Sequence, residues 1–146
     1  MDQYPQLLLL SDEVYEHIVF EPHQSIHQRP LLHERSMVIS SFGKTFHITG
    51  WKIGYVVAGP QLMHELLKVH QYLVFCVNSI AQHTLANYIP KVDTRALASF
   101  YQQKRDRFRA ALTESRFELL PSQGSYFQLA SYAQLSTKSD IDFCRS

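Results

Sequence analysis

The chain has 146 residues, of which 45% are hydrophobic and 18% charged, and its formal net charge is +1. This length is enough for one domain with a hydrophobic core, and the nearly neutral charge argues against a nucleic-acid-binding protein. The two cysteines, Cys76 and Cys144, match no metal or redox spacing, and the apolar run Leu7–Leu10 is too short to cross a membrane. We therefore expect a reduced, cytoplasmic protein without a membrane or nucleic-acid partner.

Three short apolar segments in the first half of the chain predict β-strands. The first, Leu7–Leu10, is expected to be fully buried and to end in the polar loop Ser-Asp-Glu-Val-Tyr, as in parallel α/β sheets. A connection rich in Pro, His, Gln and Arg follows over residues 21–35. Ser36–Ser41 is predicted as the second strand and Ile53–Ala58 as the third, which ends at Gly59-Pro60.

Helical patterns dominate the middle of the chain. Pro60 is expected to begin a helix, because Leu62, Leu66, Leu67, Val69, His70 and Leu73 recur on one face. A second helix is predicted over roughly Ile80–Ile89 and is closed by Pro90. A long amphipathic helix is predicted from Thr94 to Ser115.

The last thirty residues predict a new strand pair. Phe117–Leu120 and Ser125–Leu129 flank the turn Pro121-Ser122-Gln123-Gly124, which indicates a hairpin. Ser139 or Asp140 then caps the start of another helix, and the chain stops before this helix could make two turns. We therefore expect an α/β protein that is part of a longer one.

Two apparent motifs fail on their spacing. Gly43-Lys44-Thr45 resembles the end of a phosphate-binding loop, but that motif requires a glycine where Val38 stands. His64-Glu65 resembles the start of a zinc-protease helix, but Lys68 occupies the position of the second histidine. The eight histidines show no ligand spacing with a carboxylate, so we expect no metal site.

Lys44 stands in a setting that suits covalent chemistry. It follows the second predicted strand, lies next to Gly43, and is followed eight positions later by Lys52. A lysine amine attacks carbonyls when it is partly desolvated or close to another cation. Hydroxyls and a second amine suit a phosphate, so the segment indicates a phosphorylated aldehyde held by a lysine, which describes pyridoxal 5′-phosphate.

Such a cofactor also needs a carboxylate that keeps its pyridine nitrogen protonated. Asp12, at the end of the preceding strand, is a candidate, and Tyr15 could bind the ring hydroxyl. Each residue has another interpretation when it is taken alone: Asp12 as a turn cap, Tyr15 as a core aromatic, Lys52 as a surface charge and Ser41 as a strand-end cap. Together they favour a cofactor site.

The combination SDEVYEH followed by SSFGKTFHITGWKIGY resembles fold type I pyridoxal-phosphate aminotransferases of class I/II, and most of all their methionine and kynurenine aminotransferase-like branch. That family has an Asp-x-x-Tyr pair, then Ser-x-x-Lys, then a basic residue within Gly-Trp-[Arg/Lys]-x-Gly. Here these positions hold Asp12 and Tyr15, Ser41 and Lys44, and Lys52. The resemblance continues through HQYLVFCVNSIAQHT, YQQKRD and LLPSQGSYFQL, and so covers nearly the whole chain.

The resemblance implies a role for each of these residues. Lys44 would form the Schiff base and move the proton, Asp12 would pair with the pyridine nitrogen, and Tyr15 would bind the phenolic oxygen. Ser41 and Lys52 would bind phosphate; many relatives have arginine at the latter position, and lysine gives up its bidentate geometry. Residues 75–78 would approach a partner subunit, and 124–126 the substrate.

The resemblance also implies an architecture. Residues 1–93 would be part of the large cofactor-binding domain, with the Ile53–Ala58 strand antiparallel, 94–116 the connecting helix, and 117–146 the start of the small domain. Intact relatives are homodimers. The family's glycine-containing phosphate loop, stacking aromatic and ring-binding asparagine precede the Asp-x-x-Tyr pair, and its substrate-carboxylate arginine lies further along than Ser146. We therefore expect an isolated chain with little or no activity.

Three functions remain open on the sequence. The chain is expected to be a fragment of an aminotransferase that acts on an L-amino acid, such as methionine or an aromatic one, and a 2-oxo acid. A β-lyase acting on cystathionine or cysteine S-conjugates would share the same fold and cofactor. A truncated remnant without catalytic activity is the third alternative.

Overall fold

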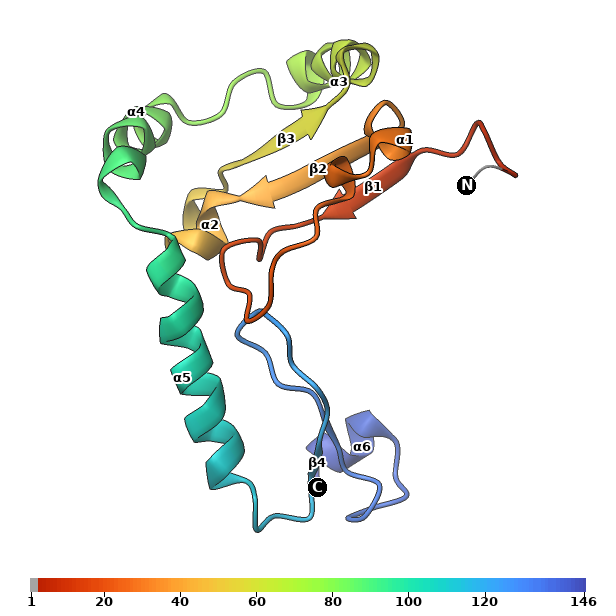
Figure 1. The fold of residues 1–146 in the computed structure, drawn as a ribbon, viewed down its shortest axis with the longest axis vertical. Coiled ribbons are helices and arrows are strands. Elements are labelled where there is room, and N and C mark those ends of the chain that lie inside the picture. Colours follow the sequence, from red (N-terminus) through yellow and green to blue (C-terminus); the bar gives the residue numbers. More distant parts are fainter. Residues whose placement is uncertain (1–2) are drawn as a thin grey trace.

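A computed structural model describes residues 3–146, in which a three-stranded sheet and a smaller strand pair are joined by one long helix (Figure 1). The sheet consists of β1 (Leu9–Asp12), β2 (Ser36–Ser41) and β3 (Gly54–Ala58), in the order β1-β2-β3. β1 is parallel to β2, with Asp12 opposite Ile39, and β3 is antiparallel to β2. The expected antiparallel direction of the third strand is confirmed, and the second predicted strand coincides with β2.

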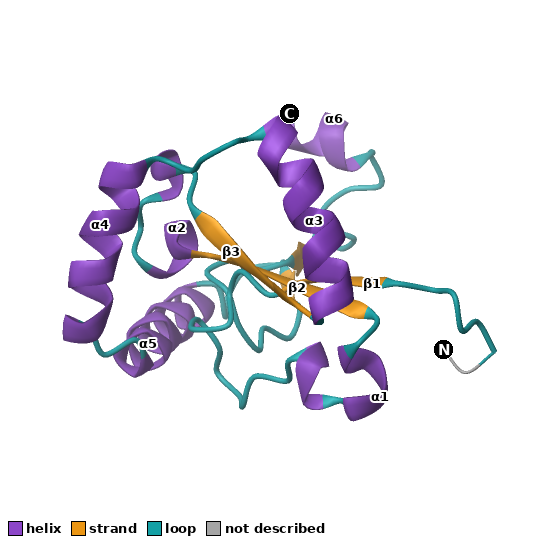
Figure 2. Ribbon diagram, turned by 90° about the horizontal axis from the view of Figure 1, so that it is seen from above, coloured by secondary structure: helices purple, strands orange, loops and turns teal. Residues whose placement is uncertain are grey.

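The helices have different positions relative to this sheet. Figures 1 and 2 both show α4 near the end of the sheet that carries α2 and α3 near the opposite end of β3, and Figure 1 shows α5 leading away to the smaller strand pair. No helix within residues 3–146 is long and apolar enough to cross a membrane. The helical elements are η1 (Ile26–Gln28), α1 (Pro30–His33), α2 (Phe42–Thr45), η2 (Thr49–Trp51), α3 (Pro60–Leu73), α4 (Ser79–Tyr88), η3 (Ile89–Lys91), α5 (Arg95–Ala111) and α6 (Asp140–Cys144).

The sequence located the main helices correctly. Pro60 occupies the first turn of α3, where its missing N–H leaves no hydrogen bond unmade. α5 ends at Ala111, four residues before the predicted end. Ser139 caps α6, since its hydroxyl accepts a hydrogen bond from the backbone N–H of Asp142 at 3.2 Å, as expected.

The predicted hairpin is wrong in its details. The paired strands are β4 (Glu118–Leu119) and β5 (Ala130–Ser131), so the connection between them is much longer than a tight turn. Its middle part returns to the loop after β1, where the backbone N–H of Ser125 donates to the carbonyl of Ile18 at 2.7 Å. A Cβ on Gly124 would lie 3.0 Å from that same carbonyl oxygen, so glycine allows this close approach.

Burial differs from expectation at the first strand. Leu10 is 64% exposed, and Leu7 and Leu8 are also exposed, so this segment is not the fully buried strand that its leucines predicted. The reason is its place in the sheet: β1 is an edge strand among residues 3–146. A buried hydrophobic cluster lies instead between α4 and the β2–β3 end of the sheet, where Ile53, Ala81 and Leu85 are buried against partly buried aromatic and aliphatic side chains.

Candidate active site

Lys44 is held at the carboxyl end of β2 by a single helical turn. Ser41 ends the strand and caps α2, because its Oγ accepts a hydrogen bond from the backbone N–H of Gly43 at 3.1 Å. A Cβ on Gly43 would come within 3.0 Å of Thr49 Cα and 3.1 Å of Ser41 Oγ. Glycine therefore lets the turn fold tightly against the following loop, and this fixes the direction of the next residue, Lys44.

Asp12 and Tyr15 reach the same region from β1. Asp12 ends that strand, and its Oδ1 accepts a hydrogen bond from the backbone N–H of Val14 at 3.3 Å. The turn that follows carries Tyr15, whose ring centre lies 5.9 Å from Nζ of Lys44. The carboxyl ends of parallel strands form a common edge where ligands bind in α/β sheets. The structure thus brings three of the predicted residues together at that edge.

The phenol of Tyr15 stays protonated over the physiological range. Burial raises the pKa of Tyr15 to about 12, and the adjacent Tyr126 hydroxyl and the charge of Asp12 add to the effect. The ring of Tyr126 packs edge-on against Tyr15, with the two centres 5.2 Å apart. A neutral phenol beside an amine can donate a hydrogen bond to an anionic oxygen, which is the role expected of Tyr15.

Lys52 lies at the same end of the sheet, between η2 and β3. It caps η2 in a left-handed backbone conformation, with φ of 52°, two residues before Gly54, which pairs with Ser41. Within residues 3–146, no carboxylate lies within 4.0 Å of the amine of Lys44 or Lys52. Two amines without acidic partners, next to a serine hydroxyl, suit a phosphate dianion.

Two acids that the sequence analysis did not single out support this edge of the sheet. Glu16 accepts hydrogen bonds from the hydroxyls of Ser40 and Tyr55, and so ties the turn after β1 to β2 and β3. Burial and the contact with Glu16 raise the pKa of Tyr55. The acids on both sides of the Val-Tyr pair were visible in the sequence, but nothing there distinguishes them from surface charges.

The turn after β1 is also fastened by Glu13. Its carboxylate accepts hydrogen bonds from the hydroxyl of Ser11 at 2.9 Å and the backbone N–H of Ile26 at 3.0 Å, and Nε2 of His23 lies 2.7 Å away. Burial opposes ionisation of Glu13, but the hydrogen bonds outweigh it and hold the pKa of Glu13 below its usual value. A charged buried acid therefore holds both ends of the loop that presents Tyr15.

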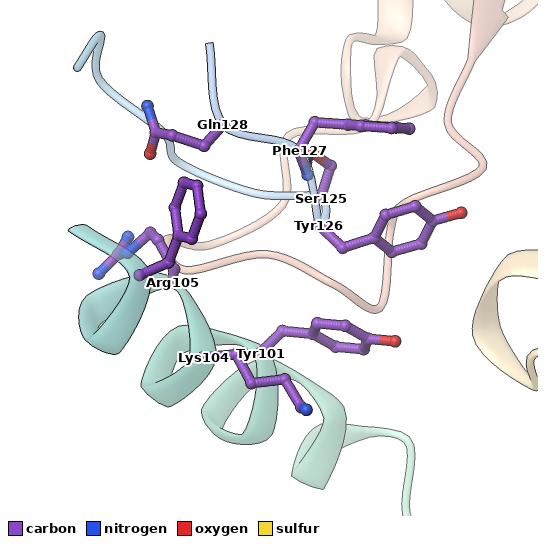
Figure 3. Close-up of a pocket in the computed structure, with 8 residues that line it drawn as sticks. Tyr101, Lys104, Arg105, Ser125, Tyr126, Phe127 and Gln128 are labelled. Atoms are coloured by element: carbon purple, nitrogen blue, oxygen red, sulfur yellow. Dashed lines mark hydrogen bonds between the residues drawn. The ribbon is translucent and has the colours of Figure 1, made fainter. Parts of the chain in front are cut away.

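A groove of about 460 Å³ lies beside this site rather than around Lys44. Figure 3 shows it between α5, which contributes Tyr101, Lys104 and Arg105, and the segment 125–128. Tyr126 forms part of its wall and also touches Tyr15. The groove thus adjoins the candidate active site through one tyrosine.

A lysine amine near a phenol, with a carboxylate, a hydroxyl and a second amine at the same edge of the sheet, suits a pyridoxal-phosphate site. The comparisons with known proteins identify the family. Residues 1–145 match the family described as aminotransferase class I and II, and the chain belongs to that family.

Its relatives include aminotransferases of several specificities. The chain is 49% identical to methionine aminotransferase of Escherichia coli over 144 residues, covering 96% of this chain and 37% of the relative. It is 32% identical to kynurenine–oxoglutarate transaminase of Dictyostelium discoideum, covering 93% of this chain and 33% of the relative. A solved Escherichia coli structure, for which a methionine aminotransferase function is identified, superposes with a TM-score of 0.86 and 48% identity over 94% of this chain and 38% of its own.

These comparisons confirm the expected family and the expected α/β fold. The chain spans 33% to 38% of the length of these relatives. Aminotransferases of this class use pyridoxal phosphate, and the groups described above fit that cofactor: an amine for its aldehyde, a carboxylate for its ring nitrogen, and donors for its phosphate. The division into domains at residues 93 and 116 stays a prediction.

Proposed function

We propose that this chain carries the lysine-bearing part of an aminotransferase active site, which moves an amino group between an L-amino acid, methionine or an aromatic one, and a 2-oxo acid. The observation that carries the proposal is the position of the Lys44 amine over the ring of Tyr15, at the edge of the sheet where Asp12 ends β1. The relatives named for methionine and kynurenine support the choice of substrates.

Each residue has a separate task in this proposal. Pyridoxal phosphate, when bound, withdraws electrons from the α-carbon of the amino acid and so makes its proton removable. Lys44 would hold the cofactor through its aldehyde, and its amine would take up the proton from the substrate's α-carbon. Asp12 would keep a proton on the ring nitrogen, and Tyr15 would donate its O–H to the ring oxygen.

Ser41 and Lys52 bind the phosphate group in this scheme. The Oγ of Ser41 already accepts the N–H of Gly43, which leaves its own O–H free to donate to a phosphate oxygen. Lys52 contributes an uncompensated charge, which attracts phosphate without the bidentate geometry of arginine.

The assembly in which this site works is also a proposal. We propose a cytoplasmic homodimer, and we expect the 146-residue chain by itself to turn over little or no substrate, since it spans only part of its relatives' length. Sustained transamination of methionine by the purified chain would refute that expectation. Release of pyruvate from cystathionine would indicate the alternative β-lyase activity instead.

The test of the lysine assignment is chemical trapping. The chain is incubated with pyridoxal phosphate, reduced with borohydride and digested, and the modified lysine is located by mass spectrometry. We expect the adduct on Lys44, and its loss in Lys44→Ala, while the exposed Lys68 of α3, which pairs with Glu65 at 2.8 Å, serves as the internal control. Equal labelling of Lys68 and Lys44 would contradict the proposal, and no labelling at all would favour a remnant without cofactor.

A further inference from the structure

One face of α5 fastens the helix to successive parts of the chain. Tyr101, Arg105 and Arg109 are spaced four residues apart and so lie above one another on the helix. Arg109 donates to the carbonyl of Leu120 and to the side chain of Gln128, both at 2.9 Å. The guanidinium of Arg105 lies 4.3 Å from the ring centre of Phe20, and its Nη1 also donates to a backbone carbonyl in the β4–β5 connection.

Tyr101 is the member of this row that reaches the segment carrying Lys44. Its hydroxyl forms a hydrogen bond of 2.6 Å with Nε2 of His47, three residues after the lysine. The two residues are 54 positions apart, so this contact joins α5 to the loop between α2 and η2. His47 holds a left-handed backbone conformation, with φ of 58°, which is uncommon for residues other than glycine.

The ring of Tyr101 also supports the contact between Tyr126 and Tyr15. Its centre lies 5.8 Å from that of Tyr126, which in turn packs edge-on against Tyr15 at 5.2 Å. Burial, together with the adjacent Tyr126, raises the pKa of Tyr101, so its hydroxyl keeps its proton at neutral pH. In Figure 3 the side chains of Tyr101 and Tyr126 extend in the same direction, one from α5 and one from the segment 125–128.

We infer that His47 and Tyr101 form a latch, a pair of positioning residues that holds Tyr126 against Tyr15 and thereby sets how closely the segment 125–128 approaches the Lys44 site. A role of the latch in catalysis rests on the proposed function, whereas the latch itself can exist without it. When the hydrogen bond is intact, the loop after Lys44, the helix α5 and the segment 125–128 move as one unit. When it is broken, the segment opens away from Tyr15.

The variants that test the latch change one contact at a time. Tyr101→Phe removes the hydroxyl and keeps the ring that packs on Tyr126. His47→Asn tolerates the left-handed backbone, but its side chain is too short to reach Tyr101. Tyr132→Phe is the matched control, because it removes a tyrosine hydroxyl that donates to the carbonyl of Lys138 at 3.0 Å, in the part of the chain near α6.

Two readouts report the opening without any cofactor. The first is the hydrogen exchange rate of the Ser125 amide, which donates to Ile18, relative to the Met63 amide in α3, which donates to Gly59. The second is the rate of acetylation of Lys44 by acetic anhydride relative to Lys68. We expect both ratios to rise about two- to tenfold in each single variant, which corresponds to the loss of one hydrogen bond. The double variant should show the same increase as each single variant, because both substitutions remove the same contact.

Three outcomes would refute the latch. If either ratio stays at the value of the unmodified chain, if the double variant shows the sum of the two single effects, or if Met63 and Lys68 accelerate as much as the site, the contact is not a latch. The same changes in Tyr132→Phe would also overturn it. A chain that shows the latch but forms no pyridoxal-phosphate adduct on Lys44 would contradict the proposed function alone.

Discussion

Glu13→Gln removes the charge from a carboxylate that is 8% exposed and holds the loop that presents Tyr15. The carboxylate binds the hydroxyl of Ser11, the side chain of His23 and the backbone N–H of Ile26. A hydrogen bond to a charged group contributes about 1.5–3 kcal/mol, and glutamine keeps one neutral acceptor oxygen. We therefore expect the free energy of unfolding to fall by about 1.5–3 kcal/mol, roughly one charged bond.

Urea unfolding followed by the fluorescence of Trp51, the single tryptophan, measures this difference. Its pH dependence follows from the lowered pKa of Glu13. Because the carboxyl group is more acidic in the folded chain than its ordinary value of 4.5, the stabilisation is complete above that pH. It is lost as the pH falls below 4.5 through the lower folded pKa, so the difference between the chain and the variant shrinks in acid.

Glu34→Gln is the matched control, because Glu34 also lies beside a histidine, His33 at 3.3 Å, but on an exposed surface. Exposed pairs of this kind contribute about 0–1 kcal/mol, so the control should change stability little. A loss in Glu13→Gln no larger than in Glu34→Gln, or a difference that persists unchanged into acid, would refute the reasoning about the buried network.

Three further substitutions test the core, the sheet and the phosphate site. Leu85→Ala should lower the free energy of unfolding by about 2–5 kcal/mol, because Leu85 is 4% exposed and packs with Ile53; urea titration measures the change, and a loss below that range would mean that the cluster is not the core. Gly54→Ala should lower the melting temperature seen by circular dichroism, since its Cβ would lie only 2.4 Å from the carbonyl oxygen of Ser40, and an unchanged melting temperature would contradict this register of β2 and β3. Lys52→Gly should raise the free energy of unfolding by about 1 kcal/mol, since glycine adopts the left-handed conformation without strain. The same variant should give less borohydride-trapped adduct at limiting pyridoxal phosphate, and an undiminished yield would show that Lys52 is not part of the phosphate site.

Strand boundaries were predicted well where polar or turn-forming residues flank an apolar segment on both sides. Ser36–Ser41 was correct at each boundary because an apolar centre lies between serines and a turn. The first strand is shifted from Leu7–Leu10 to Leu9–Asp12. Four consecutive leucines show no alternation of apolar and polar residues, so the sequence does not define the register of this strand. The register is defined by the pairing of Leu9 with Ser36.

The same limit explains what was missed at the end of the chain and at the site. Pro121–Gly124 marked a reversal, but Ser125 finds its backbone partner at Ile18, a contact that local turn chemistry does not reveal. The spacing of Asp12, Lys44 and their companions matched a family pattern, so these candidates could be named from sequence. The hydrogen bond between His47 and Tyr101 follows no periodicity, and only the folded chain places the two residues together.

The strained backbone positions point to the same region by an independent route. Of the four non-glycine residues with positive φ among residues 3–146, three surround the candidate site: His47, Lys52 and Ser125. Such a conformation costs about 1–3 kcal/mol for a residue with a side chain, whereas glycine adopts it freely. Each side chain has a use that glycine would lose: His47 binds Tyr101, Lys52 presents an amine, and the hydroxyl of Ser125 accepts the N–H of Phe127 at 3.1 Å. Backbone strain of this kind often occurs at functional sites, so its position here supports the proposed site.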